Sequence, residues 1–196
     1  MSTEKTRSAY HHGDARNALL KAAGALLEHS GAAGLSLRSI AERAGLSRQA
    51  PYNHFADKAA LLADLIVDGF ARLHDAMSVA EREGTTPFER LELAGLAYIA
   101  FAQSSPALFR LMFASELVDP ASHPQIRAGH VSALAIVSGI LESMAEADDA
   151  ADLTLAAWSL VHGYATLCIE TGLEGPDRRE ARAALFARVI AAAANR

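Results

Sequence analysis

The sequence predicts an all-α protein with a small N-terminal head and a larger helical body. Alanine and leucine dominate the composition, while aromatic residues make up 6% of the chain, and these proportions favour helix over sheet. Apolar residues recur at helical spacing along the chain, between polar capping residues and glycine stops. With 196 residues, 51% of them hydrophobic, the chain has ample material for a buried core.

The head is predicted to contain three helices. Residues 14–30 place their leucines on one face of an amphipathic helix that ends at Gly31. Ser36 caps a short second helix, and Gly45 follows it where a left-handed residue is needed. Ser47 is expected to cap a third helix, so the order is helix, glycine turn, helix.

The body is predicted to continue as six helices. Asp57 caps the first, and Thr86 and Glu89 form a capping box around a proline at the first helical position of the second. The expected helices cover about residues 58–83, 86–103, 105–113, 123–144, 149–171 and 177–194. We place the boundary between the head, residues 1–57, and the body, residues 58–196, where charge and aromatic content change.

Charge is spread unevenly along the chain. The net charge is −5, but residues 1–56 hold seven basic and four acidic residues, which leaves the remainder at −8. A basic head on an acidic body favours contact between the head and a polyanion, although a difference this modest also arises by chance. The single Cys168 excludes a disulfide framework and a Cys-rich zinc site. Without a secretory signal or a membrane-spanning stretch, a soluble cytoplasmic protein is expected.

The segment from Ser36 to Lys58 has the pattern of a helix-turn-helix, in which the second helix presents its first residues to the DNA major groove. Arg48 can pair with guanine and Gln49 with adenine through two hydrogen bonds each. Phosphate contacts are expected from several others, although the Tyr52 ring can instead pack. The candidate DNA-binding residues are Ser36, Arg38, Ser47, Arg48, Gln49, Tyr52, His54 and Lys58. The alternative is an ordinary helical hairpin in a core. In either case Leu37, Ile40, Leu46 and Phe55 are expected to form the small core of the head rather than to contact DNA.

The amino-acid sequence of this segment resembles that of the DNA-binding head of the TetR family of transcriptional regulators. The resemblance rests on Ser47, Tyr52, His54, Phe55, Lys58, Leu61 and Leu62. Residues 10–14, Tyr-His-His-Gly-Asp, and 158–163, Trp-Ser-Leu-Val-His-Gly, resemble a branch named for a Trp-His-Gly motif in its C-terminal domain. Two residues depart from the family pattern. Pro51 replaces an aliphatic residue and is expected to stiffen the reading helix, and Gln49 replaces a small one, adding either a base reader or a clash.

The resemblance implies that the body binds a small molecule and dimerises through its last two helices. Those helices are rich in alanine, which allows close packing either within one subunit or between two. Aromatic residues and methionines in the middle of the chain suit either an ordinary core or an apolar pocket. The candidate ligand-binding residues are Tyr98, Phe101, Phe109, Met112, Phe113, Met144, Trp158 and His162.

Individual residues of the body leave alternatives open. His162 lies one helical turn from Trp158 and can bind a ligand or a backbone carbonyl inside a dimer bundle. Gly163 permits close approach of a helix or a ligand, and Cys168 is expected to be a buried filler rather than a redox sensor. His11 and His12 lack partners at ligand spacing, so no metal is expected, and an ordered N-terminal arm near the head or the DNA is favoured.

The function predicted from these observations is that of a ligand-responsive transcriptional regulator. We expect a homodimer that binds a double-stranded operator as a repressor and releases it when a largely apolar effector binds the body. No cofactor is expected, and no enzyme is, because the sequence lacks the nucleophile elbow, phosphate loop, dinucleotide fingerprint and zinc-protease motif. The alternative is a helical ligand-binding or interaction module that does not read specific DNA.

Overall fold

The computed structural model describes residues 4–114, 116–119 and 121–194, with side chains described for 15–114, 116–119, 121–146 and 149–194. These described residues form eight α-helices and three short 3-10 helices, without a strand among them. In chain order the elements are α1 (Glu4–Ser30), η1 (Ala32–Gly34), α2 (Leu37–Arg43), η2 (Ala50–Asn53), α3 (Lys58–Glu81), α4 (Pro87–Ser104), α5 (Pro106–Phe113), α6 (Pro124–Leu141), α7 (Ala147–Thr171), η3 (Pro176–Arg178) and α8 (Arg179–Ala194). The predicted all-α fold is confirmed.

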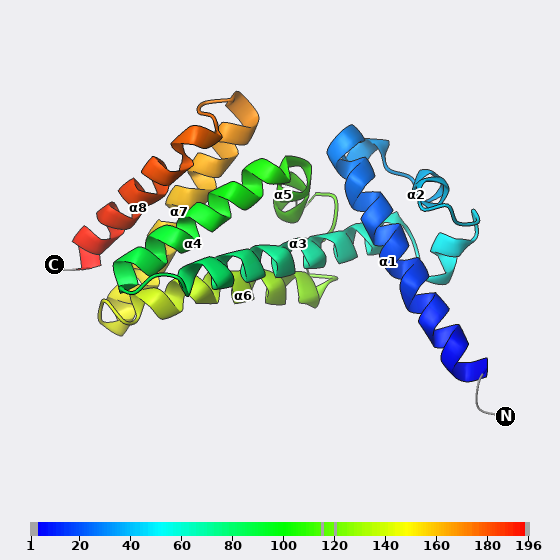
Figure 1. The fold of residues 1–196 in the computed structure, drawn as a ribbon, viewed down its shortest axis with the longest axis horizontal. Helices are drawn as coiled ribbons and strands as arrows, with labels where there is room; N and C mark the ends of the chain where they lie inside the picture. Colours follow the sequence, from blue (N-terminus) through cyan, green and yellow to red (C-terminus); the bar gives the residue numbers. More distant parts are fainter. Residues whose placement is uncertain (1–3, 115, 120, 195–196) are drawn as a thin grey trace.

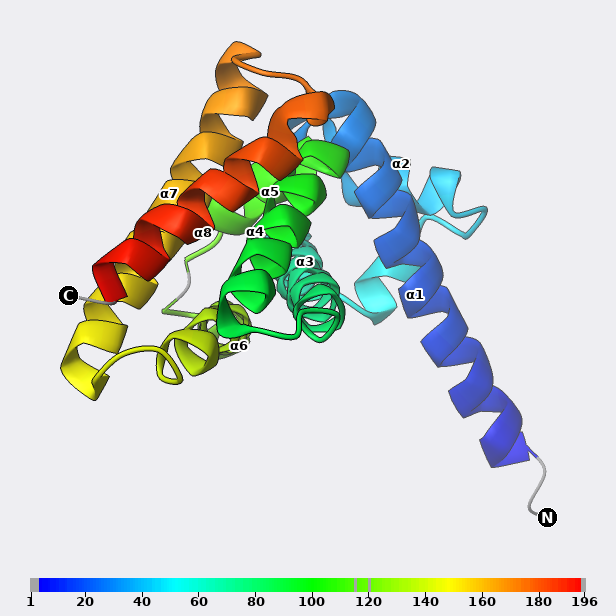
Figure 2. The same cartoon turned by 60° about the vertical axis from the view of Figure 1, so that its left-hand side comes forward.

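The head and the last two helices lie at opposite ends of an elongated molecule (Figure 1). At the head end, α1 stands between the body and α2. The helix α3 runs from the head into the body, where it packs against α4 and α6. At the far end, α7 and α8 pack against each other and against α4, as a second view also shows (Figure 2). The long helix α3 is therefore shared by head and body.

The helix starts predicted from capping residues are confirmed where the caps are local. The Ser36 hydroxyl accepts a hydrogen bond from the amide three residues on at 3.0 Å, and the Asp57 carboxylate does the same at 2.8 Å. Thr86 and Glu89 form the reciprocal capping box. These bonds satisfy amides that have no partner within the helix, so they fix where α2, α3 and α4 begin.

A continuous apolar core runs from the head into the body. In the head, Leu37, Ile40 and Phe55 are buried and Leu46 is half-buried, as predicted for this small core. The Arg16 guanidinium lies over the Phe55 ring at 5.5 Å and forms an ion pair with Asp64 of α3. This ion pair joins α1 of the head to the first part of α3.

Two element boundaries differ from the prediction. The first helix begins at Glu4 rather than at residue 14, so the expected N-terminal arm is a continuation of α1. The last segment opens with the 3-10 helix η3 before α8 begins at Arg179. The side chains of Tyr10, His11 and His12 lie outside the described residues.

Candidate nucleic-acid interface and ligand cavity

The turn that follows α2 reverses the chain through one glycine. Gly45 has a φ of +70°, a conformation that costs glycine little. Its amide donates to the Glu42 carbonyl at 3.2 Å, and the Leu46 amide donates to the Ala41 carbonyl at 3.0 Å. This bond pair is the Schellman motif, which satisfies the last carbonyls of the helix. The predicted helix-turn geometry is confirmed here.

The predicted third head helix, capped by Ser47, is wrong in its form. The structure has the four-residue 3-10 helix η2, with Gln49 before it and no side-chain cap. Pro51 explains the difference, because it has no amide hydrogen to donate to the Ser47 carbonyl and so interrupts an α-helical ladder. The neighbouring amides bond three residues back instead, from Ala50 to Ser47 and from Tyr52 to Gln49.

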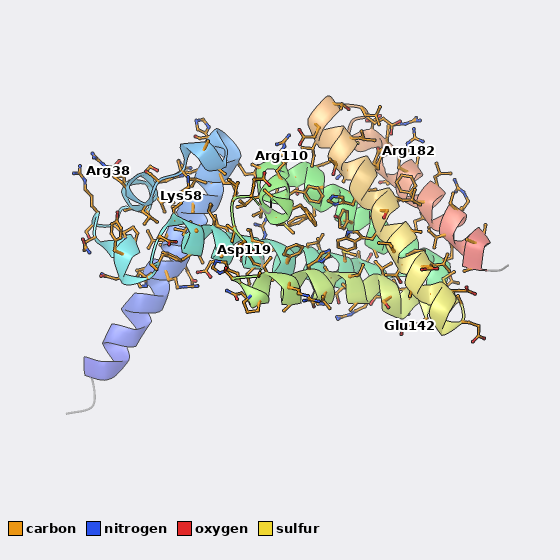
Figure 3. All side chains as sticks on the ribbon, turned by 180° about the vertical axis from the view of Figure 1, so that it is seen from behind. Arg38, Lys58, Arg110, Asp119, Glu142 and Arg182 are labelled. Carbon is orange, nitrogen blue, oxygen red and sulfur yellow. The ribbon has the colours of Figure 1, made fainter. Side chains whose placement is uncertain are left out.

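An exposed surface carries most of the predicted DNA contacts, and we call it the reading surface. Its members, all exposed, are Ser36, Arg38, Ser47, Arg48, Gln49 and Tyr52. The Arg38 and Arg48 side chains are 65% and 70% exposed, and both Nε atoms lie near Glu42 Oε1, at 3.1 and 3.8 Å. One exposed carboxylate therefore lies within ion-pair distance of both arginines. Arg38 extends outward from the head in Figure 3.

Two predicted DNA contacts belong to the interior of the head as well. His54 is half-buried beside Phe55, with 6.4 Å between the ring centres. The Lys58 ammonium donates to the Ala32 carbonyl at 2.8 Å, because α3 begins beside the open carbonyls of η1. Lys58, expected to supply charge to DNA, thus also holds the start of α3 to η1.

The body contains a largely apolar cavity of about 430 Å³ between α3, α5 and α6, and we call it the first cavity. Ligand sites in proteins commonly measure ~300–1,000 Å³. The lining residues are Ile66, Phe70, Leu111, Met112, Phe113, Ala114, Val118, Ala121, Ile126, Arg127 and His130. Two of them, Arg127 and His130, bring polar groups to an otherwise apolar wall.

A second cavity of about 290 Å³ lies on the other side of Phe113 and Ala114, which line both spaces. Its remaining lining residues are Phe109, Arg110, Glu116, His162, Thr166, Ile169 and Glu170. The Phe113 ring lies 4.4 Å from the His162 ring and 5.6 Å from the Phe70 ring, measured between centres. Phe113 therefore forms the partition between the two cavities.

Half of the predicted ligand-binding residues line these cavities. Met112 and Phe113 line the first, and Phe109, Phe113 and His162 line the second. Trp158 and Tyr98 lie behind the cavity walls, with the Trp158 ring centre 5.2 Å from that of His130 and 5.0 Å from that of Tyr98. They support the walls rather than forming them.

Phe101 and Met144, also predicted to bind a ligand, line neither of these two cavities. Phe101 is buried under the Arg72 guanidinium, at 5.7 Å from the ring centre, because α4 turns this residue toward α3. Met144 follows the end of α6 at Leu141, at the end of that helix remote from the first cavity. Helical spacing alone did not show which face of each helix borders a cavity and which face borders the core.

Sequence reasoning missed several lining residues, notably Phe70, Ile126, Arg127 and His130. Phe70 belongs to the predicted apolar stripe of α3, which gave no reason to separate cavity from core. Ile126 and His130 are four residues apart and so share one face of α6. That spacing, with an arginine between them, was the one available signal.

A hydrogen bond joins His162, which lines the second cavity, to Tyr98. The Tyr98 hydroxyl and His162 Nδ1 are 2.8 Å apart, so Tyr98 is a hydrogen-bond partner of His162 within the subunit. Burial lowers the pKa of His162, and the nearby His130 lowers it further. Burial also lowers the pKa of His130 and raises that of Tyr98. All three groups are thereby favoured in their neutral forms.

A direct link joins α1 of the head to α5 of the body. The Glu28 carboxylate accepts hydrogen bonds from the amides of Ala107 at 3.1 Å and Leu108 at 2.9 Å. The side chain of Ser105, the N-cap residue of α5, makes no capping hydrogen bond. Because α5 also supplies three residues to the wall of the first cavity, the head and the cavity share one short helix.

Two further classes of site were searched for in the described part of the chain. Its side chains include no group of three or more His, Cys, Asp or Glu placed to hold a metal ion. None of its helices is both long and apolar enough to cross a membrane.

Comparison with known proteins identifies the family. Residues 91–193, more than half of the chain, match the tetracyclin repressor-like C-terminal domain, and residues 19–65 match the bacterial regulatory proteins of the tetR family. The chain belongs to the TetR family of DNA-binding transcriptional regulators. The C-terminal match includes the Trp158–Gly163 motif, and the N-terminal match includes the helix-turn-helix.

The chain is also similar to individual proteins. An HTH-type transcriptional regulator of Mycobacterium tuberculosis is 28% identical over 159 residues, which cover 78% of this chain and 67% of the relative. A solved protein of unknown function from Rhodococcus sp. RHA1 is 32% identical, with a TM-score of 0.77 over 92% of this chain and 97% of that one. The regulator FadR from Bacillus subtilis, solved with stearoyl-CoA, shares the fold at 16% identity, with a TM-score of 0.72 over 90% of this chain and 97% of that one. The chain spans about 60% to 80% of the length of the curated relatives it matches.

Proposed function

We propose that this TetR-family chain is a homodimeric repressor that binds operator DNA through the reading surface and releases it when an apolar small molecule fills the first cavity. The observation that carries the proposal is the bond between Glu28 of α1 and the first amides of α5. A molecule that displaces α5 changes how α1 is held. The heads of a dimer would then lose the spacing that fits two half-sites.

The exposed arginines of the head support DNA recognition. Arg48 follows the glycine turn directly, and Arg38 lies on α2 beside it, both within reach of Glu42. An arginine held by a nearby carboxylate keeps its planar donors presented to the outside, where they can bind guanine or phosphate. His54 and Tyr52 are proposed as phosphate contacts on the same side.

Exposed apolar residues on α7 and α8 support dimerisation. Leu155, Leu167, Leu185 and Val189 are between 37% and 66% exposed. Between them lie exposed small residues, among them Gly163, beside which an added Cβ would meet nothing within 4 Å. The alanines of these helices divide accordingly: Ala150, Ala157, Ala183 and Ala187 are buried within the subunit, and Ala151, Ala156 and Ala181 are exposed. A second copy packed here would cover a surface that is costly to leave in water.

The apolar wall of the first cavity supports a largely apolar effector. The FadR structure shows that a protein of this fold was solved with an acyl-CoA, and we extend only the apolar character to this chain. Coupling between effector and operator sites of ~1–3 kcal/mol would change operator affinity about 5- to 150-fold. We propose a regulatory role in the bacterial cytoplasm and no catalytic one.

Fluorescence anisotropy with DNA from upstream of the gene tests the proposal. We expect tight, sequence-dependent binding with a steep salt dependence, and a loss of ~1–3 kcal/mol together with relaxed specificity in Arg48→Ala. Arg43→Ala is the matched control, because Arg43 is exposed on α2 but lies outside the reading surface. Weak binding that is equal for all DNA, in a random-sequence selection as well, would favour the alternative of a ligand-binding module that does not read DNA.

A further inference from the structure

The first cavity has an unequal distribution of polar groups. Its wall is apolar except for Arg127 and His130, which lie on successive turns of α6. None of the residues that line it is acidic. Because burial lowers the pKa of His130, this imidazole is neutral near pH 7 and adds no charge. Arg127 is thus the one charged group on the wall of an apolar space.

Arg127 is also free of an ion pair within the described part of the chain. No described carboxylate lies within 4 Å of its guanidinium, whereas eight other arginines of the described residues have such a partner. The nearest carboxylate along the chain on the cavity side, Asp119, already accepts from the Ala121 amide at 2.9 Å and the Ser122 hydroxyl at 2.8 Å. That carboxylate is used to shape the segment before α6.

The second cavity provides a contrast within the same molecule. Its arginine, Arg110, donates to Glu170 Oε1 at 2.6 Å and to the Ile169 carbonyl at 3.1 Å. The Arg110 charge is therefore neutralised by the protein itself. Arg110 and Arg127 line two cavities that share the Phe113 partition. Of these two arginines, Arg127 of the first cavity is the one left available to a bound molecule.

We infer that the first cavity takes an amphiphile whose apolar part lies against Phe70 and Ile126 and whose anionic head group pairs with Arg127. An arginine fork suits a carboxylate or a phosphate oxygen pair equally, so the shared chemistry is an anionic head on an apolar chain. Arg127 is exposed, which places the head group at the mouth of the cavity and keeps it hydrated on one side. The inference rests on the proposed role of the cavity as the effector site.

Trp158 provides a direct signal for the test. It is the chain's single tryptophan, it is buried, and its ring centre lies 5.2 Å from that of His130. A molecule that enters the first cavity should therefore change the fluorescence emission of Trp158. Titrations of the full chain with decanoate, decyl phosphate and decanol compare one apolar chain with three head groups.

The wild type is expected to bind decanoate or decyl phosphate about three- to tenfold more tightly than decanol, the range for a half-hydrated charge pair. Arg127→Gln should remove that preference while leaving decanol binding unchanged, and Arg127→Lys should keep part of it. Arg110→Gln, the matched control at the second cavity, should keep all of it. The affinities for decanoate and decyl phosphate show whether the site prefers a carboxylate or a phosphate.

Equal affinity for decanol and both anions in the wild type would overturn the inference, as would a preference that survives in Arg127→Gln. Release of operator DNA by decanol as readily as by decanoate would overturn it while keeping the proposed effector role. If none of the three amphiphiles alters Trp158 emission or operator binding, the inference falls together with that role. Specific binding of the operator would still stand on its own measurement.

Discussion

Glu28 of α1 accepts a hydrogen bond from the backbone amide of Leu108 of α5 at 2.9 Å, across 80 residues of sequence. A carboxylate at a helix N-terminus satisfies free amides and interacts favourably with the helix dipole. Such caps ordinarily come from the residue before the helix. Here α1 of the head supplies the cap for α5, a short helix that lines the first cavity. A displacement of α5 therefore affects how α1 is held.

Glu28→Ala is expected to weaken this link. The free energy of unfolding, measured by urea titration, should fall by ~1 kcal/mol, the usual cost of a lost helix cap. Operator affinity should then respond less to decanoate than in the wild type, because displacement of α5 is no longer passed to α1. Glu83→Ala, which removes an exposed glutamate just beyond α3, is the control. An unchanged response to decanoate would show that coupling takes another route, with α3 the obvious candidate.

Val189→Glu is expected to disrupt the dimer. Val189 is 51% exposed on α8, and a carboxylate there would have to be desolvated in the interface we propose. Sedimentation velocity at micromolar concentration should show a dissociation constant raised at least about tenfold, which corresponds to ~1.4 kcal/mol. Val79→Glu places the same charge at an exposed valine of α3 and should leave the dimer intact. A wild type that is already monomeric would refute the proposed interface.

The free energy of unfolding is expected to fall in mild acid because of the half-buried His130 and His162. The pKa of His162 and that of His130 are lowered in the folded chain, so below pH ~6.5 the unfolded chain binds protons that the folded chain resists. Their contribution to stability is full above pH ~6.5 and declines as the pH falls toward the lowered values. Urea midpoints at about pH 7.5 and pH 5.5 measure this slope.

His162→Asn should flatten that slope, since the imidazole and its bond to Tyr98 are both removed. His29→Asn, at an exposed position near the end of α1, is the control and should leave the slope as in the wild type. The same slope in His162→Asn and in the wild type would contradict the assignment of acid sensitivity to this histidine.

Phe113→Ala is expected to join the two cavities. The Phe113 ring separates spaces of about 430 and 290 Å³, so its removal should admit a longer apolar chain. We expect hexadecanoate to gain about tenfold in affinity relative to decanoate, read from Trp158 emission, at a stability cost of ~2 kcal/mol. Phe101→Ala truncates a buried phenylalanine that lines neither cavity and should lose stability without that gain. Equal changes in both variants would mean that Phe113 is core rather than partition.

The outcome at the head shows how far local sequence patterns reach. The caps of α2, α3 and α4 and the Gly45 turn were predictable because each bond joins residues at most five apart. The third head helix was mispredicted although its cause was also local. Pro51 was expected to stiffen the third helix, but the chain forms a four-residue 3-10 helix in place of the expected α-helix.

By itself the sequence determined the helices, their caps, the helix-turn-helix and the family, because these depend on spacing within a few turns of chain. The tertiary structure alone decided which face of each helix borders a cavity and which borders the core. It also decided that Lys58 bonds Ala32, 26 residues away, and that Glu28 caps α5, 80 residues away. Such contacts depend on how helices cross in space. The same helical spacing of apolar residues is compatible with a face that contacts a neighbouring helix, a cavity or a second subunit.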